Sequence, residues 1–210
     1  MTITQNAEKQ AAMTPDMALA LLTEGNQRFQ ENRRADRDLR QQVNETRTGQ
    51  WPFATLLGCV DSRAPAELIF DLGIGDVFNA RVAGNVVNED LLGSIEFACK
   101  VAGSKLVVVL GHTHCGAVKG ACDDVRLGNL TGLLAKLRPA VEQTSEPEAQ
   151  QQRNSQNAAF VNAVALRNVE LNVEAIREHS PVLRELEDEG TIRILGAMYD
   201  IETGAVEFLG

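Results

Sequence analysis

The sequence predicts an α/β fold with a mostly parallel central sheet flanked by helices. Two observations lead to this prediction. Short apolar runs of strand length alternate with longer segments that have the spacing of amphipathic helices. The two most apolar runs, residues 53–60 and 105–110, lack the polar alternation of a half-exposed strand, as parallel strands covered on both faces do. The length of 210 residues is sufficient for one substantial hydrophobic core.

Residues 1–50 are predicted to form a helical N-terminal arm. Residues 1–13 are expected to be mobile or lightly docked. Thr14 and Pro15 then mark a helix start, because a hydroxyl caps the first turn and proline fits its first position. The polar residues 33–49 are predicted to be helical with few apolar anchors, so packing on a partner subunit and simple solvent exposure are equally good interpretations.

Residues 51–210 are predicted to form a single α/β domain, which contains all the candidate site residues named below except Gln50. Apolar and β-branched runs bounded by glycine, asparagine or aspartate predict the strands, and apolar residues at helical spacing predict the helices. The expected strands are 53–60, 76–82, 105–110, 191–199 and, after a turn at 201–204, an antiparallel edge strand at 205–209. The expected helices are 65–72, 88–101, 129–143 and 160–179, with a surface loop or frayed helix at 144–157.

Charge and cysteine content exclude several classes of partner. The formal net charge of −9 argues against nucleic acid and against anionic membrane surfaces. No apolar run approaches the length of a transmembrane helix, and the first 15 residues lack the pattern of a signal peptide. Four cysteines without the spacing of a small disulfide-rich domain fit a reducing compartment. We therefore expect a cytoplasmic protein.

Three soft metal ligands follow the two most apolar strands. Cys59 ends the first run, and His112 and Cys115 follow the second. The carboxyl ends of parallel strands meet at one edge of a sheet, so these side chains should converge. Two thiolates and an imidazole suit Zn²⁺ better than Mg²⁺ or Ca²⁺, and three protein ligands leave one position open, as in catalytic zinc sites. Either cysteine alone would more often be a small buried hydrophobe, but the joint pattern favours a metal site.

The combined pattern resembles the signature of the β-class carbonic anhydrases. The similarity covers residues 59–63 and 111–116, extends over about residues 50–120, and resumes at 199–204. It implies that Zn²⁺ is the cofactor, that Cys59, His112 and Cys115 are its ligands, and that Asp61 and Arg63 form a catalytic pair. Asp61 would accept a hydrogen bond from the nucleophile, while Arg63 would keep that carboxylate ionised. The alternative, an ordinary surface ion pair, is the weaker interpretation beside three metal ligands.

The resemblance also implies a small apolar substrate pocket and a homodimer or a higher oligomer of dimers. The residues that line this pocket, partly contributed across the dimer interface, would be Gln50, Phe78, Ala83 and Phe97. Each aromatic residue alone would more often belong to the core. The implied reaction is reversible hydration of CO₂ to bicarbonate and a proton. Hydrolysis of a CO₂ analogue, carbonyl sulfide or carbon disulfide, and a catalytically silent zinc-binding scaffold remain as alternatives.

One position departs from the pattern of those family members that bicarbonate inhibits. Arg81 and Tyr199 match the inhibitory site, but Leu56 stands where that site has a tryptophan. The site should therefore be incomplete, and Asp61 is expected to stay paired with Arg63.

Overall fold

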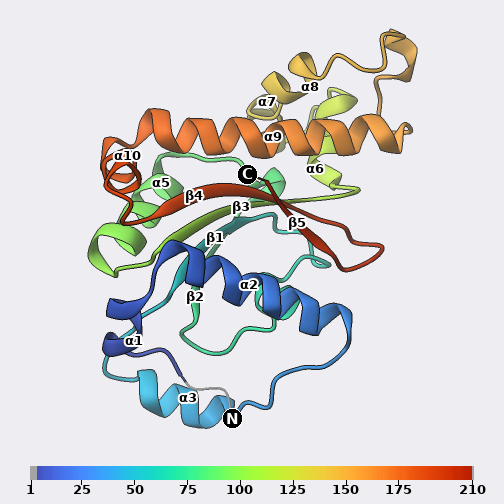
Figure 1. The fold of residues 1–210 in the computed structure, drawn as a ribbon. Coiled ribbons are helices and arrows are strands. Elements are labelled where there is room, and N and C mark those ends of the chain that lie inside the picture. The colour runs from blue at the N-terminus through green and yellow to red at the C-terminus, as the bar shows by residue number, and fades with distance from the viewer. Residues whose placement is uncertain (1–3, 210) are drawn as a thin grey trace.

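The computed structural model describes residues 4–209, in which one five-stranded sheet is covered by helices on both faces (Figure 1). The strand order is β2-β1-β3-β4-β5, and every neighbouring pair is parallel except β4 with β5. The predicted α/β class and the antiparallel final edge strand are confirmed. The strands are β1 (Ala54–Gly58), β2 (Val77–Arg81), β3 (Leu106–His112), β4 (Arg193–Tyr199) and β5 (Val206–Leu209).

One face of the sheet is covered by α2 (Pro15–Gln30), with α4 (Ala66–Ile69) beside it. Thr14 caps α2 as predicted, because its hydroxyl accepts a hydrogen bond from Met17 N at 3.2 Å. The two helices lie very close: a Cβ on Gly25 would stand 1.9 Å from the carbonyl oxygen of Phe70. The core beneath contains Ala18, Leu22, Leu56, Ile69, Val108, Leu110 and Leu195.

The other face is covered by the long helix α9 (Ala158–His179), with α5 (Glu89–Glu96) and α10 (Pro181–Asp188) (Figure 1). Alternate residues of β3 point to opposite faces, so Val107 and Val109 pack beneath α9 while Val108 packs beneath α2. Burial of β3 on both faces explains its unbroken apolar sequence. Three short elements connect these strands and helices. The 3₁₀ turn η1 (Ala83–Asn85) follows β2, the π-helical η2 (Phe97–Val101) precedes β3, and the helix α6 (Gly116–Cys122) follows β3.

The N-terminal arm is docked at residues 4–13, one of the two expected states, and differs from its prediction at residues 33–38. Residues 4–13 are docked through α1 (Ala7–Ala12), where Gln10 Nε2 donates to Pro52 O at 2.9 Å; residues 1–3 lie outside the described part. Only α3 (Leu39–Thr46) is helical within 33–49. Residues 33–38 leave the helical path because Ala35 N and Arg37 bond to Asp71 instead. Contact of this arm with a partner subunit stays a prediction.

The helices near the C-terminal half also required correction. The helix predicted at 129–143 is divided into α7 (Gly128–Ala135) and α8 (Arg138–Gln143), because Pro139 has no N–H to continue the helical hydrogen bonds. Within the predicted loop lies a short turn, η3 (Gln150–Gln152). The helix α10 was not predicted, although Ser180 caps it and Pro181 begins it. Among residues 4–209, no helix combines the length and apolar character needed to cross a membrane.

Candidate metal centre

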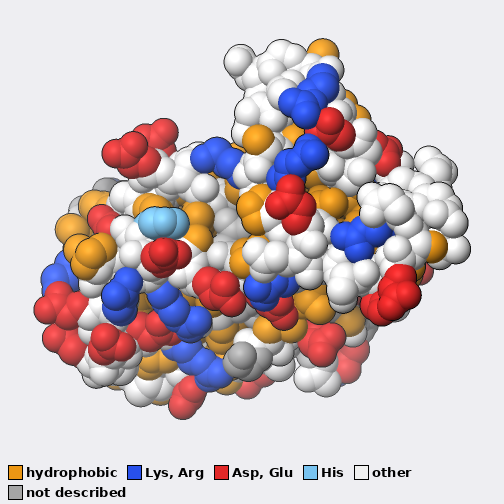
Figure 2. Space-filling view, turned by 90° about the horizontal axis from the view of Figure 1, so that it is seen from above, with side chains coloured by type: hydrophobic (Ala, Val, Ile, Leu, Met, Phe, Trp, Pro, Cys, Tyr) orange, Lys and Arg blue, Asp and Glu red, His pale blue; other side chains and the backbone are white. Residues whose placement is uncertain are grey.

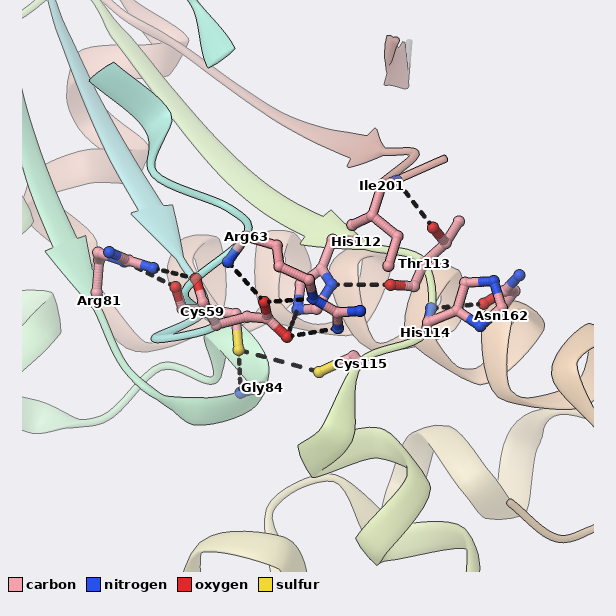
Figure 3. Close-up of polar contacts among 11 residues, drawn as sticks. Cys59, Arg63, Arg81, Gly84, His112, Thr113, His114, Cys115, Asn162 and Ile201 are labelled. Atoms are coloured by element: carbon pink, nitrogen blue, oxygen red, sulfur yellow. Dashed lines mark hydrogen bonds and ion pairs between the residues drawn. The ribbon is translucent and has the colours of Figure 1, made fainter. Parts of the chain in front are cut away.

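The three candidate ligands meet at the carboxyl edge of the sheet. Cys59 follows β1 directly, and His112 is the last residue of β3. The parallel register pairs Gly58 with Leu110, which brings these two strand ends side by side. Cys115 then stands at the first position before α6, so its side chain turns back toward Cys59 (Figure 3). The strand-end rule therefore correctly predicts that these three side chains converge.

The geometry of the three ligand atoms suits a tetrahedral ion. The donor atoms of Cys59, His112 and Cys115 all lie within 4.8 Å of one another. The two sulfurs are 4.0 Å apart, close to the ~3.8 Å that two sulfurs span when each is about 2.3 Å from a tetrahedral zinc. The imidazole Nε2 of His112 is buried and has no hydrogen-bond partner among the described residues. Such an orphaned nitrogen beside two thiols is what a metal ligand requires.

The orientation of the imidazole is fixed by its own backbone neighbour. His112 Nδ1 lies 2.9 Å from the carbonyl oxygen of Thr113, and a carbonyl can only accept, so Nδ1 carries the proton. Nε2 is then left with a free lone pair that faces the sulfurs. A metal-ligating histidine is commonly held in place by such a hydrogen bond from its other ring nitrogen.

Cys59 and Cys115 differ in how readily their thiols ionise. The pKa of Cys59 is lowered to about 4, mainly because the Cys115 thiol donates to its sulfur, which outweighs the opposing effect of burial. Gly84 N also donates to the Cys59 sulfur at 3.3 Å. The pKa of Cys115 is raised, because its proton is held by Cys59 and a second buried negative charge is unfavourable. Both groups can ionise together only when a cation balances them.

A carboxylate and a guanidinium lie beside these ligands. Arg63 donates two side-chain hydrogen bonds to Asp61, from Nε to Oδ1 at 3.0 Å and from Nη2 to Oδ2 at 2.9 Å. This bidentate pairing lowers the pKa of Asp61 to about 2. Asp61 Oδ2 lies 3.9 Å from His112 Nε2, so the carboxylate borders the metal position.

Comparison with known proteins agrees with this geometry. Residues 54–206 match the carbonic anhydrase family. The chain belongs to the β-carbonic anhydrase family. Carbonic anhydrase 2 of Mycobacterium tuberculosis is 36% identical over 193 residues, which is 90% of each chain. A β-carbonic anhydrase of Aspergillus fumigatus is 32% identical, with a TM-score of 0.72 over 92% of this chain and 89% of that one. Another from Sordaria macrospora, described as tetrameric, is 29% identical, with a TM-score of 0.72 over 80% and 85%.

The residues expected to line the pocket of this β-carbonic anhydrase are not all brought together within one chain. Ala83 begins η1, next to Gly84 and its contact with Cys59. Phe78 and Phe97 contact each other edge to face, with ring centroids 6.1 Å apart. They lie in a groove of about 690 Å³ between β2 and α5, and the metal ligands are not among the residues that line it. Gln50 is exposed beyond α3.

Arg81 has a structural task that the sequence did not reveal. It ends β2 opposite Gly58, and its guanidinium donates to the carbonyl oxygens of Cys59 at 2.8 Å and Asp61 at 2.6 Å. These bonds fix the backbone that carries one ligand and the carboxylate. The sequence feature that could have indicated this role is the position of Arg81 at the end of a predicted strand. The family resemblance had linked Arg81 only to an inhibitory site.

The surface over α9 carries both signs of charge. Figure 2 shows Lys and Arg side chains interspersed with Asp and Glu on this face. This face therefore lacks the continuous basic area expected for binding nucleic acid.

Proposed function

We propose that this protein catalyses the reversible hydration of CO₂ to bicarbonate and a proton, with Zn²⁺ as its cofactor. The observation that carries the proposal is the convergence of Cys59, Cys115 and the unpartnered Nε2 of His112 beside the ionised Asp61. Thiolate and imidazole donors are typical zinc ligands. Zinc bound there would lower the pKa of water and so supply hydroxide near neutral pH.

We assign Asp61 and Arg63 the catalytic roles. Asp61 is held ionised by Arg63, so its Oδ2 can accept a hydrogen bond from a hydroxyl nucleophile and turn the oxygen lone pair toward CO₂. A carboxylate fixed in advance loses little freedom during the reaction, which is why such groups contribute strongly to rate. The hydrogen bonds from the Arg81 guanidinium to the carbonyl oxygens of Cys59 and Asp61 hold the Asp61 backbone in position relative to His112.

The substrate pocket is proposed to include Gln50, Phe78, Ala83 and Phe97. Ala83 begins η1 and precedes Gly84, whose N–H donates to the Cys59 sulfur, whereas the exposed Phe97 and the edge strand β2 border an open groove in this chain. A second subunit that covered this groove would bury Phe78 and Phe97, in keeping with the pocket shared across a dimer interface that the family resemblance implies. We therefore propose a homodimer or an oligomer of dimers, in keeping with the tetrameric relative.

The oligomer proposal is tested by size-exclusion chromatography with light scattering. An active species at twice or more the chain mass of 22.8 kDa is expected. An active monomer would contradict the shared pocket. A cytoplasmic location is also proposed, supported by four cysteines that are all free.

The function is tested by zinc analysis together with stopped-flow CO₂ hydration from pH 6 to 9. We expect one zinc per chain and hydration well above the buffer rate. Full zinc occupancy with hydration equal to the buffer blank would instead identify a silent scaffold. Turnover of carbonyl sulfide or carbon disulfide exceeding that of CO₂ at equal concentration would replace the proposal with the analogue hydrolase.

A further inference from the structure

The backbone between the second and third ligands is held in an unfavourable conformation. His114, which lies between His112 and Cys115, has φ of 57°. This left-handed region is sparsely populated by residues other than glycine, and it persists only where the surroundings impose it. The segment 112–115 is called the metal loop below. Its shape sets the separation of His112 Nε2 from Cys115 Sγ, so whatever imposes the shape also sets the ligand geometry.

Thr113 connects the metal loop to the turn between β4 and β5. Its N–H donates to Tyr199 O at 2.9 Å, which extends the pairing of β3 and β4 by one residue. Its hydroxyl accepts from Ile201 N at 3.1 Å (Figure 3). The same hydroxyl donates to Asp200 Oδ1 at 3.4 Å. Its carbonyl oxygen accepts from the His112 imidazole. One residue therefore joins a candidate zinc ligand to a neighbouring turn.

The turn that receives Thr113 is itself well braced. Asp200 Oδ1 accepts from Glu202 N at 2.9 Å, and Oδ2 accepts from the Thr203 hydroxyl at 3.0 Å. From the opposite side, Asn26 of α2 donates to Gly204 O at 2.9 Å and accepts from Val206 N at 2.9 Å. Asn26 is 3% exposed. The turn can therefore act as a fixed point for the metal loop.

A second contact reaches the metal loop from α9. Asn162 Oδ1 accepts from His114 N at 3.0 Å (Figure 3). The His114 imidazole turns outward, with Nε2 3.0 Å from Glu202 Oε1. The peptide that must adopt the left-handed conformation is thus held by α9 at its N–H and by the β4–β5 turn at its side chain.

We propose that Thr113 and Asn162 are positioning residues that shape the metal loop before zinc binds, an inference that rests on the proposed zinc site. Neither side chain is assigned to the metal. Each acts through the backbone that carries His112 and Cys115. Groups that orient metal ligands in this way commonly change metal affinity by about 10–100-fold when they are removed.

The test measures zinc affinity of the full chain by competition with a chromogenic chelator. Thr113→Val removes the hydroxyl but keeps the side-chain shape, and we expect the zinc Kd to rise at least about tenfold. Thr113→Ser restores the hydroxyl and should stay within about threefold of the native Kd. Thr46→Val, which removes a hydroxyl bonded to Gln42 O at 2.8 Å in α3, is the matched control and should leave affinity unchanged.

A spectroscopic readout separates positioning from general stability. The visible bands of a Co²⁺-substituted protein report ligand angles, so Thr113→Val should shift them and Thr46→Val should not. Asn162→Ala should raise the zinc Kd in the same direction, whereas Asn162→Asp keeps an acceptor for His114 N and should recover most of the affinity. If Thr113→Val fails to fold, the comparison of Asn162→Ala with Asn162→Asp still tests the proposal.

The possible outcomes lead to distinct conclusions. Weaker zinc binding in Thr113→Val and Asn162→Ala, with recovery in the conservative variants, supports the proposal. Native zinc affinity and native Co²⁺ bands in folded Thr113→Val and Asn162→Ala would overturn it, even if their melting temperatures fell. Native protein that fails to bind zinc would overturn the proposed function as well, so the two failures are distinguishable.

Discussion

The two ends of the parallel strands each hold a buried cysteine and an aspartate, but the two pairs have opposite acid–base properties. Cys59 and Asp61 lie at the carboxyl ends, beside His112. Asp76, just before β2, and Cys99, in η2 before β3, lie at the amino ends. Cys59 and Cys99 are each 5% exposed. Burial is therefore equal for the two thiols, and it does not explain why they differ.

Hydrogen-bond donors and charges make the difference. The pKa of Cys59 is lowered to about 4 by the Cys115 thiol, whereas desolvation raises the pKa of Cys99 to about 12. Arg63 lowers the pKa of Asp61 to about 2. Desolvation raises the pKa of Asp76, and this effect outweighs the hydrogen bond that its carboxylate accepts from Gly73 N at 2.7 Å. The same residue types thus supply a reactive site at one end and packing at the other.

The largest expected contrast is in zinc binding by the cysteine variants. Cys59→Ser should lose zinc, because a serine hydroxyl is not ionised at neutral pH and is a far poorer ligand than a thiolate. Cys99→Ser is the matched control with equal burial at the other end of the sheet, and it should keep one zinc per chain. Metal analysis after dialysis checks both, and full zinc occupancy in Cys59→Ser would remove Cys59 from the ligand set.

A smaller contrast is expected in turnover of the aspartate variants. Asp61→Asn should keep zinc and lose about a hundredfold in kcat, because an amide cannot act as the ionised acceptor that orients the nucleophile. Asp76→Asn should keep native turnover, since Asp76 lies at the opposite end of the strands. Stopped-flow CO₂ hydration near pH 8 measures both. Near-native turnover in Asp61→Asn would show that Asp61 does not orient the nucleophile.

The sheet and the convergence of the three candidate ligands were predictable from sequence, because both depend on short patterns and one general rule. The runs that became β1 and β3 are apolar throughout, as doubly covered strands are. Once they are parallel neighbours, their carboxyl ends must bring Cys59 and His112 together. The family resemblance added the roles of Asp61 and Arg63, which spacing alone could not assign.

The remaining features depend on contacts between residues distant in sequence. His114 N meets Asn162 across 48 positions, and the Thr113 hydroxyl meets Ile201 across 88. No local pattern marks such pairs. Residues 33–38 were mispredicted for the same reason, since Asp71 draws Arg37 out of a helical path. An apolar residue such as Phe97 also gives no sequence signal that separates an open groove from the core.

The last and smallest contrast is in how stability depends on pH. The raised pKa of Asp76 means that the folded state holds this proton more tightly than the unfolded chain. Stability should therefore fall as pH rises from the unfolded pKa of about 4 through the folded value. Asp76→Asn removes this loss and keeps an oxygen to accept from Gly73 N. Its free energy of unfolding should exceed the native value at pH 7, and this advantage should disappear toward pH 4.

The matching variant at the other end should show the opposite sign. The lowered pKa of Asp61 gives stability that is present above the unfolded pKa and is lost as pH falls toward about 2. Asp61→Asn should therefore be less stable than native at pH 7, with a deficit that shrinks in acid. Urea unfolding of the metal-free proteins from pH 2 to 8 measures both differences. If Asp76→Asn were instead less stable than native at pH 7, with a deficit that disappeared toward pH 4, the ionised Asp76 carboxylate would be stabilising. The proposed opposition between the two ends would then not hold.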